Sequence, residues 1–193
     1  MRSKGFEGMA CSIAAVMGAI GDRWGMLIMR DLLLGIRRYD DLRQSSGVTN
    51  ASLSDRLKLL EENGLVERRR YQTRPERFEY QPTGRGRDLG LLMQAMVQIG
   101  DQWNLSNLEG PPLDFMDRRT GQGVKLITVN RETSGPVERD HLGVRPGRGA
   151  DALMTWRLSR GSERAESSAV RSGQSQGADY PAVRDDHSSA RSP

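Results

Sequence analysis

The stretch YDDLRQSSGVTNASLSDRLKLLEENG, residues 39–64, contains two helical patterns separated by a tight turn. The first predicted helix covers 39–45, and Gly47 lies in the turn that follows it. The second begins after Thr49, which is a good N-cap, and ends at Gly64. Its apolar side is a narrow line of leucines at helical spacing, Leu53, Leu57 and Leu60. Two helices joined by a short turn that contains glycine predict a helix-turn-helix.

The sequence period changes directly after this motif. Residues 65–71 and 77–81 are short segments compatible with β-strands, and they flank the turn-forming residues 72–76. We therefore expect a hairpin, or wing, next in the chain. Thr83 then begins a long helix whose apolar residues recur at alternating steps of three and four. That spacing is typical of a helix that packs against a partner helix, and it is set by Leu89, Leu92, Met96, Ile99 and Trp103.

Two further helices are expected before the motif. The first covers 11–20 and has one apolar stripe, which consists of Ile13, Val16, Met17 and Ile20. Asp22 can cap the second helix, which ends before Gly35. Its apolar stripe consists of Trp24, Leu27, Ile28 and Leu32. The sequence thus predicts a mainly α fold with a small β-hairpin wing, a winged helix-turn-helix domain over 8–105.

The last third of the chain differs in composition from the rest. We expect a small β-rich extension over 113–158, because the segment at 116–121 is echoed at 129–135 and each has the pattern strand, turn, strand. From about Arg160 onward serine, glycine and charged residues dominate. Such a composition does not offset the conformational entropy lost on folding, so we expect 160–193 to be a disordered tail.

Composition narrows the classes of function. Lys and Arg total 29 against 25 acidic residues, a net charge of +4 that suits an anionic partner. Cys11 is the single cysteine, so neither a disulfide framework nor a cysteine metal site is expected, and we predict no metal and no cofactor. No apolar run is long enough to span a membrane, and Glu7 interrupts the pattern of a signal peptide. We expect a cytoplasmic protein.

The sequence does not predict an enzyme. The two histidines, His141 and His187, lie in the loosely patterned C-terminal part. No Ser/His/Asp arrangement, pair of carboxylates or phosphate loop occurs at the spacing that catalysis would need.

The outward side of the 49–63 helix carries side chains suited to DNA. Because its leucines point inward, Ala51, Asp55 and Lys58 lie on the opposite side, and Ser52 and Arg56 lie on one flank. Serine can bond base edges or phosphates, arginine and lysine favour guanine or phosphate, and aspartate can accept from cytosine N4. An ordinary solvated helix face is the alternative interpretation. The predicted DNA contacts of this helix are Thr49, Asn50, Ala51, Ser52, Asp55, Arg56 and Lys58.

The densest basic cluster lies in the predicted hairpin. Strand alternation sends Arg68 and Arg70 to one face and Arg69 to the other, so these three cannot all touch DNA together. Arg74 and Arg77 lie at or beside the tip, where an arginine can enter the minor groove or bind a backbone phosphate. We predict that these two contact DNA. A hairpin whose charges merely keep it soluble is the alternative interpretation.

Several linked motifs between Cys11 and Trp103 resemble the HxlR family of bacterial transcriptional regulators, a branch of winged-helix proteins related in architecture to MarR regulators. In chain order they are CSIA at 11–14, IGDRW at 20–24, LLLG at 32–35, RYDDL at 38–42, LSDRLKLLE at 53–61, PERFEY at 75–80 and TGRG at 83–86. Each motif is weak alone. In this order and at these distances they are specific, and they cover about half of the chain.

The resemblance implies a homodimer that binds a palindromic operator in double-stranded DNA, with the 49–63 helix of each subunit in the major groove. One departure is Ala51, where the family often has a lysine or another polar residue. Some relatives carry cysteines in two hairpins of a C-terminal extension; here there are none, so a zinc ribbon is not expected. The alternative function is a winged-helix module for protein interaction without specific DNA binding.

The dimer interface is expected on the first helix and the long helix, at Ile13, Val16, Met17, Leu89, Leu92, Met96, Ile99 and Trp103. The resemblance implies that Cys11 lies near this interface. Family members that sense quinones, aldehydes or oxidants often use a cysteine matching this position, which implies a thiol-responsive regulator with a small-molecule effector. The favoured interpretation is a small buried apolar residue, because no basic residue adjoins Cys11 in sequence to activate the thiol.

Overall fold

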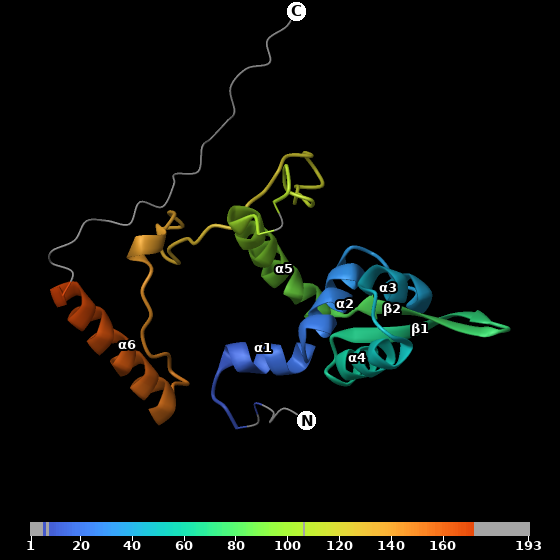
Figure 1. Ribbon diagram of the computed structural model, residues 1–193, viewed down its shortest axis with the longest axis horizontal. Helices are drawn as coiled ribbons and strands as arrows, with labels where there is room; N and C mark the ends of the chain where they lie inside the picture. Colours follow the sequence, from blue (N-terminus) through green and yellow to red (C-terminus); the bar gives the residue numbers. More distant parts are fainter. Residues whose placement is uncertain (1–5, 7, 106, 172–193) are drawn as a thin grey trace, which may run out of the picture. The chain divides into compact units, whose positions relative to one another are not determined.

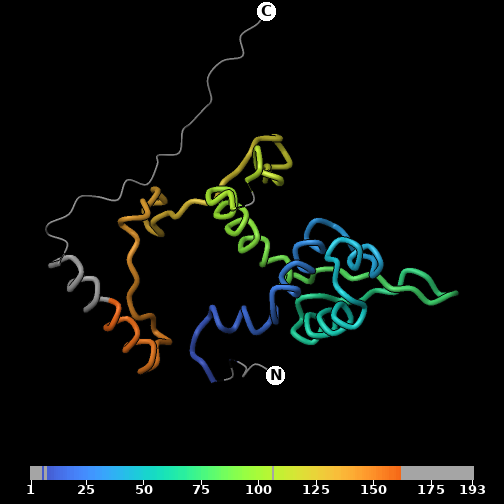
Figure 2. Tube along the Cα trace, viewed as in Figure 1, coloured from blue at the N-terminus to red at the C-terminus, as the bar shows by residue number. Residues whose placement is uncertain are grey.

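The computed structural model describes residues 6, 8–105 and 107–171, and the chain divides into two compact units, of which the first ends at Gly143 and the second begins at Val144. Figures 1 and 2 follow the elements along the chain. The first unit contains α1 (Ser12–Ile20), α2 (Arg23–Leu33), α3 (Tyr39–Ser46), α4 (Asn50–Glu62), β1 (Val66–Thr73), β2 (Glu76–Pro82), α5 (Gly84–Trp103) and the short 3-10 helix η1 (Arg139–His141). The second unit contains α6 (Ala152–Arg171).

The two predicted N-caps, Asp22 and Thr49, are confirmed, and Thr83, the predicted start of the long helix, is an N-cap as well. Asp22 caps α2 by accepting hydrogen bonds from the backbone N–H groups of Trp24 and Gly25, both at 3.0 Å. The Thr49 hydroxyl caps α4, and the Thr83 hydroxyl caps α5. Each cap satisfies a backbone donor that the first turn of a helix leaves unpaired.

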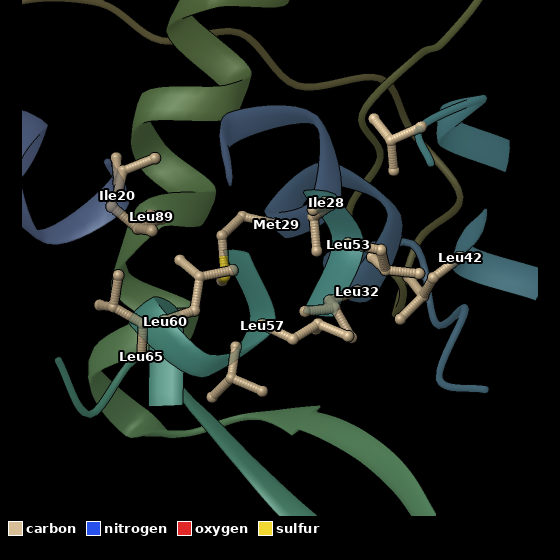
Figure 3. Packing of buried hydrophobic residues seen from close by; sticks show 12 residues of the cluster. Ile20, Ile28, Met29, Leu32, Leu42, Leu53, Leu57, Leu60, Leu65 and Leu89 are labelled. Carbon is tan, nitrogen blue, oxygen red and sulfur yellow. The ribbon is translucent and has the colours of Figure 1, made fainter. Parts of the chain in front are cut away.

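The core of the first unit forms around the leucine line of α4. Leu53, Leu57 and Leu60 are buried, as predicted, and they pack against apolar side chains of α2 (Figure 3). The same cluster includes Ile20, Ile28, Met29, Leu32, Leu42, Val48, Leu65, Val66 and Leu89. Burial of each such side chain contributes about 1.5–3 kcal/mol, so this cluster is what holds the helix-turn-helix together.

The wing is an antiparallel hairpin of β1 and β2. Its turn is shorter than predicted: Thr73 pairs with Glu76, so the strands extend into the expected 72–76 loop. Strand pairing depends on backbone groups, and the polar side chains of this segment do not prevent it. Arg38, directly before α3, pairs with Glu79 of β2 through an isolated antiparallel β-bridge.

A close approach of backbones joins the wing to α5. A Cβ atom added at Gly86 would collide with the carbonyl oxygen of Leu65. Glycine therefore lets the first turn of α5 lie directly against the entry to β1. This contact fixes the base of the wing on the core.

α1 and α2 meet at a sharp corner, with a bend of 78° between them. Of the predicted stripe of α1, Ile20 is buried, whereas Ile13, Val16 and Met17 are exposed. Among the described residues no single helix has the length and apolar composition needed to cross a membrane. α1 and α2 meet those criteria only as a bent pair.

The echo predicted within the extension takes the form of two similar turns, each closed by a single bridge in place of the predicted strands. Isolated β-bridges join Met116 to Gly123 and Val129 to Pro136. In each turn the first side chain, Asp117 or its counterpart Asn130, accepts a hydrogen bond of 2.9 Å from the backbone N–H two residues later. In the described segment 113–143, these two isolated bridges are the only β pairing.

The end of the described chain differs from the prediction. α6 covers Ala152–Arg171, so 152–158 is not β-rich, and disorder does not begin at 160. The Asp151 carboxylate accepts a hydrogen bond of 2.7 Å from the Met154 N–H, in the manner of an N-cap, and alanine, leucine and methionine are good helix formers. These local signals prevail over the low apolar content. The rest of the predicted tail, 172–193, lies outside the described residues.

Candidate nucleic-acid interface

The outward side of α4 is free of the core. Asn50, Ala51, Asp55 and Lys58 are exposed, and Ser52 is half-buried. Lys58 lies 3.8 Å from Glu62 one turn later, an exposed ion pair of the kind that contributes little to stability. This side of the helix therefore presents one cation, one anion and small polar groups without an apolar barrier between them.

Hydrogen bonds organise the first turn of α4. The Thr49 hydroxyl accepts from the Ser52 N–H at 3.2 Å and donates to the Ser52 hydroxyl at 3.1 Å. The Tyr39 hydroxyl donates to the Asn50 carbonyl at 2.9 Å and also lies 2.9 Å from the Ser54 hydroxyl. Tyr39 and Ser54 were not among the predicted site residues, because a contact between two helices is not visible in the spacing along either one.

Arg56 is not a free side chain. Its Nε and Nη2 atoms donate to Oδ2 of Asp22, at 2.9 and 2.7 Å. This hydrogen-bonded pair holds the pKa of Asp22 below its ordinary value and raises the pKa of Arg56. Sequence spacing placed Arg56 correctly on the flank of the helix but did not reveal its partner, which lies in another element.

Most arginines of the wing strands are also engaged. Arg69 forms an ion pair with Glu67, and Arg70 forms one with Glu76 at 3.3 Å. The Arg68 guanidinium lies 3.5 Å from the centre of the Phe78 ring, a cation–π contact.

Arg74 and Arg77 differ from these three. They are exposed at and beside the turn, and no ion pair involves either of them among the described residues. The two arginines predicted to contact DNA are thus the ones with their charge uncommitted.

A second exposed surface is apolar and lies on α1 and α5. Ile13 is 72 % exposed and Trp103 is 66 % exposed, and Val16, Met17, Met96 and Ile99 are also exposed. A groove of about 790 Å³ runs between these helices. Its apolar lining includes Ile13, Val16, Met17, Ile20, Leu91 and Leu92.

One residue predicted for a dimer interface, Leu89, lies in the core, and a second, Leu92, contacts both the core and the groove. Leu89 is 8 % exposed and belongs to the core of its own subunit, so it is not available to a partner. Leu92 is half-buried and packs against the same core. Leu91, which the periodic pattern missed, is exposed on the groove instead.

Cys11 is half-buried and is the N-cap residue of α1, with no side-chain capping hydrogen bond. The favoured interpretation, a buried apolar residue, is therefore met only in part. In the described part of the chain, no group of three or more His, Cys, Asp or Glu side chains could hold a metal ion.

A helix-turn-helix followed by a hairpin on the same core defines the winged helix-turn-helix class of DNA-binding domains. The family model described as HxlR-like helix-turn-helix matches residues 19–107. The uncharacterized HTH-type transcriptional regulator Rv3095 of Mycobacterium tuberculosis is 38 % identical over 149 residues, which cover 77 % of this chain and 92 % of that protein. A second regulator of this type, sll1512 of Synechocystis, is 34 % identical over 97 residues, covering 50 % of this chain and 72 % of the relative.

Two solved structures that are similar to this chain are also of transcription-factor candidates. The transcription-factor candidate PA1607 has a TM-score of 0.64 at 26 % identity, covering 75 % of this chain and all of that chain. The candidate PA1374 from Pseudomonas aeruginosa has a TM-score of 0.52 at 31 % identity, covering 77 % of this chain. The chain belongs to the HxlR-like helix-turn-helix family: it is a transcriptional regulator with a helix-turn-helix DNA-binding domain, and not an enzyme.

Proposed function

We propose that the protein is a homodimer that represses or activates transcription by binding a palindromic operator in double-stranded DNA. The observation that carries this proposal is the pair of surfaces in one unit: an outward α4 face with exposed polar groups, and an exposed apolar face on α1 and α5. We assign both roles to residues 8–105. In a bacterial cell this DNA is reached in the cytoplasm, where we expect the protein to act.

In the proposed complex α4 lies in the major groove. Ser52 and Asp55 are the candidates for base contact, because a hydroxyl can bond several base edges and a carboxylate accepts from cytosine N4. Lys58 and Asn50 lie on the same exposed side and suit phosphate oxygens. Ala51, exposed between them, offers only a methyl group, which suits an apolar contact with thymine.

The wing supplies affinity in this proposal. Arg74 and Arg77 have no carboxylate to neutralise them among the described residues, so their charge is available for phosphates or for a narrow minor groove. Arginine contacts of this kind release counterions from DNA, and binding should therefore weaken steeply as salt is raised.

The second subunit is proposed to cover the apolar face of α1 and α5. Neighbouring exposed apolar side chains on a domain surface favour an interaction site, and a repeat of three and four along α5 suits a second helix. Self-association makes the same face meet itself about a two-fold axis, and a palindromic operator has the matching symmetry.

The experiment is a selection of bound sequences from random duplexes, followed by titration of the selected operator and of a scrambled duplex at moderate and high salt. The proposal predicts a palindromic consensus, tighter binding to the operator, and a loss of affinity by orders of magnitude at high salt. Absent, salt-insensitive or equal binding to the two duplexes would contradict it. A module for protein interaction alone would give that result.

A further inference from the structure

One flank of α4 is fastened to the corner between α1 and α2. Arg56 donates to the Asp22 carboxylate at the start of α2, through the two hydrogen bonds described above. At the C-terminal end of α4, the Asn63 side-chain amide donates to the Ala19 carbonyl of α1 at 3.0 Å. We call this set of residues the α1–α4 clamp: Ala19, Gly21 and Asp22 on one side, and Arg56, Leu59 and Asn63 on the other.

The middle of the clamp is a close packing contact. Gly21 has a φ of +93°, and a Cβ atom added there would lie 2.5 Å from Cδ2 of Leu59. Glycine thus serves two purposes at the corner, since it adopts a positive φ and leaves room for Leu59. A side chain at this position would strain the backbone and require the Leu59 side chain to move.

The clamp residues of α4 form a line separate from its DNA-facing side. Arg56, Leu59 and Asn63 recur at helical spacing, so they share one flank. Asp55 and Lys58 lie on the exposed side of the same helix. Because the clamp holds one flank of α4, it also fixes the direction in which the exposed side of α4 faces.

The Asp22 carboxylate has its acceptor sites occupied from two directions. Oδ1 accepts from the Trp24 and Gly25 N–H groups, and Oδ2 accepts from Nε and Nη2 of Arg56. One side chain therefore caps α2 and restrains α4. The charged hydrogen bonds to Arg56 are of the stronger kind, although both side chains remain about one third exposed.

We propose that Arg56 is a positioning residue: with Leu59 and Asn63 it holds α4 against the end of α1 and so sets the orientation in which α4 meets DNA. This inference rests on the proposed function and replaces the direct DNA contact that the sequence predicted for Arg56. Because α1 also bears the exposed apolar face, the clamp joins the proposed dimer surface to the DNA-facing helix through one corner.

Asp22→Asn separates positioning from simple electrostatics, because electrostatics alone leaves the ratio of operator affinity to scrambled-duplex affinity unchanged, whereas the clamp predicts that this ratio falls. Asparagine is as good an N-cap as aspartate, so α2 keeps its cap while Arg56 loses its anionic partner. Removing a negative charge near DNA should by electrostatics alone tighten binding to every duplex. The clamp instead predicts that the ratio of operator affinity to scrambled-duplex affinity falls by about fivefold, the effect of a well-formed surface ion pair.

Arg56→Met removes the other partner of the ion pair and completes the test. Glu62→Gln is the matched control, because it breaks the exposed ion pair between Glu62 and Lys58, which lies outside the clamp. The clamp predicts the same loss of ratio for Arg56→Met, no further loss in the double variant with Asp22→Asn, and an unchanged ratio for the control. The salt slope should stay at the wild-type value. A slope reduced by about 0.9, with equal loss on both duplexes, would mean that Arg56 binds a phosphate, and would overturn the proposal.

Amide hydrogen exchange of the DNA-free protein gives a second readout. Exchange over Asn50–Glu62 should be faster in Asp22→Asn than in the control, and equal exchange in the two variants would overturn the clamp. If wild-type protein shows no preference for any duplex, the proposed function fails, and the exchange result still decides whether the clamp exists.

Discussion

Ile13→Glu is the sharpest test of the proposed dimer. Ile13 is 72 % exposed in the subunit and lies in the first turn of α1, where a negative charge is favourable to the helix. The folded subunit should therefore tolerate glutamate. In a two-fold dimer the residue occurs twice, and losing the burial of two isoleucines removes at least about 3 kcal/mol of association free energy. Unpaired buried carboxylates add to this loss, so the dimer dissociation constant should rise by more than about 100-fold.

Sedimentation over a range of concentrations measures this constant. Leu34→Glu is the control, because Leu34 is also an exposed apolar residue but lies at the far end of α2 from α1. The control should associate as the wild type does. A dimer of unchanged strength in Ile13→Glu would show that α1 is not part of the interface, and equal weakening in both variants would show that the effect is not specific to this face.

Three further predictions follow from individual contacts. Arg74→Ala should lower the slope of log affinity for DNA against log salt concentration by about 0.9, the value for one lost phosphate contact. Arg69→Ala should change this slope less, because Arg69 is paired with Glu67 within the wing. Equal slopes in the two variants would contradict this prediction. In thermal unfolding Gly86→Ala should cost about 1–3 kcal/mol through its collision with the backbone, while Gly90→Ala, in open space on the same helix, should stabilise by about 1 kcal/mol. Arg56 lowers the pKa of Asp22, so the ion pair stabilises the fold above the unfolded-state pKa of this carboxyl. This stabilisation is lost as the pH falls through the folded-state pKa. The stability advantage of wild type over Asp22→Asn should therefore shrink below about pH 4. A stability advantage that does not shrink as the pH is lowered through the acid range would contradict this prediction.

The helix-turn-helix could be predicted because its signals are local. Thr49 caps a helix through its own backbone, and the spacing of Leu53, Leu57 and Leu60 gives the buried side directly. Solvent-facing residues such as Asp55 follow by geometry. The same reasoning gave the side of α4 on which Arg56 lies, but its ion partner comes 34 residues earlier and no local pattern reports it.

Helical spacing also did not separate the subunit core from a surface for a partner. Leu89 and Met96 share one periodic line along α5, yet Leu89 is buried within its own subunit and Met96 is exposed. Which turn of a long helix leaves the core depends on where neighbouring elements end, and here α5 extends past them. α6 was not predicted, because the composition of this segment indicates disorder although the cap at Asp151 is a local helix signal.

Binding to a single half-site tests most directly whether the protein acts as a dimer on a palindrome. The affinity of the wild-type protein is measured for the selected operator, for the same duplex with one half-site scrambled, and for a fully scrambled duplex of equal length. We predict that losing one half-site brings the affinity most of the way to that of the scrambled duplex, with two subunits bound to each intact operator. Equal affinity for the one-half-site duplex and the full operator, with one subunit bound, would contradict the proposed dimer.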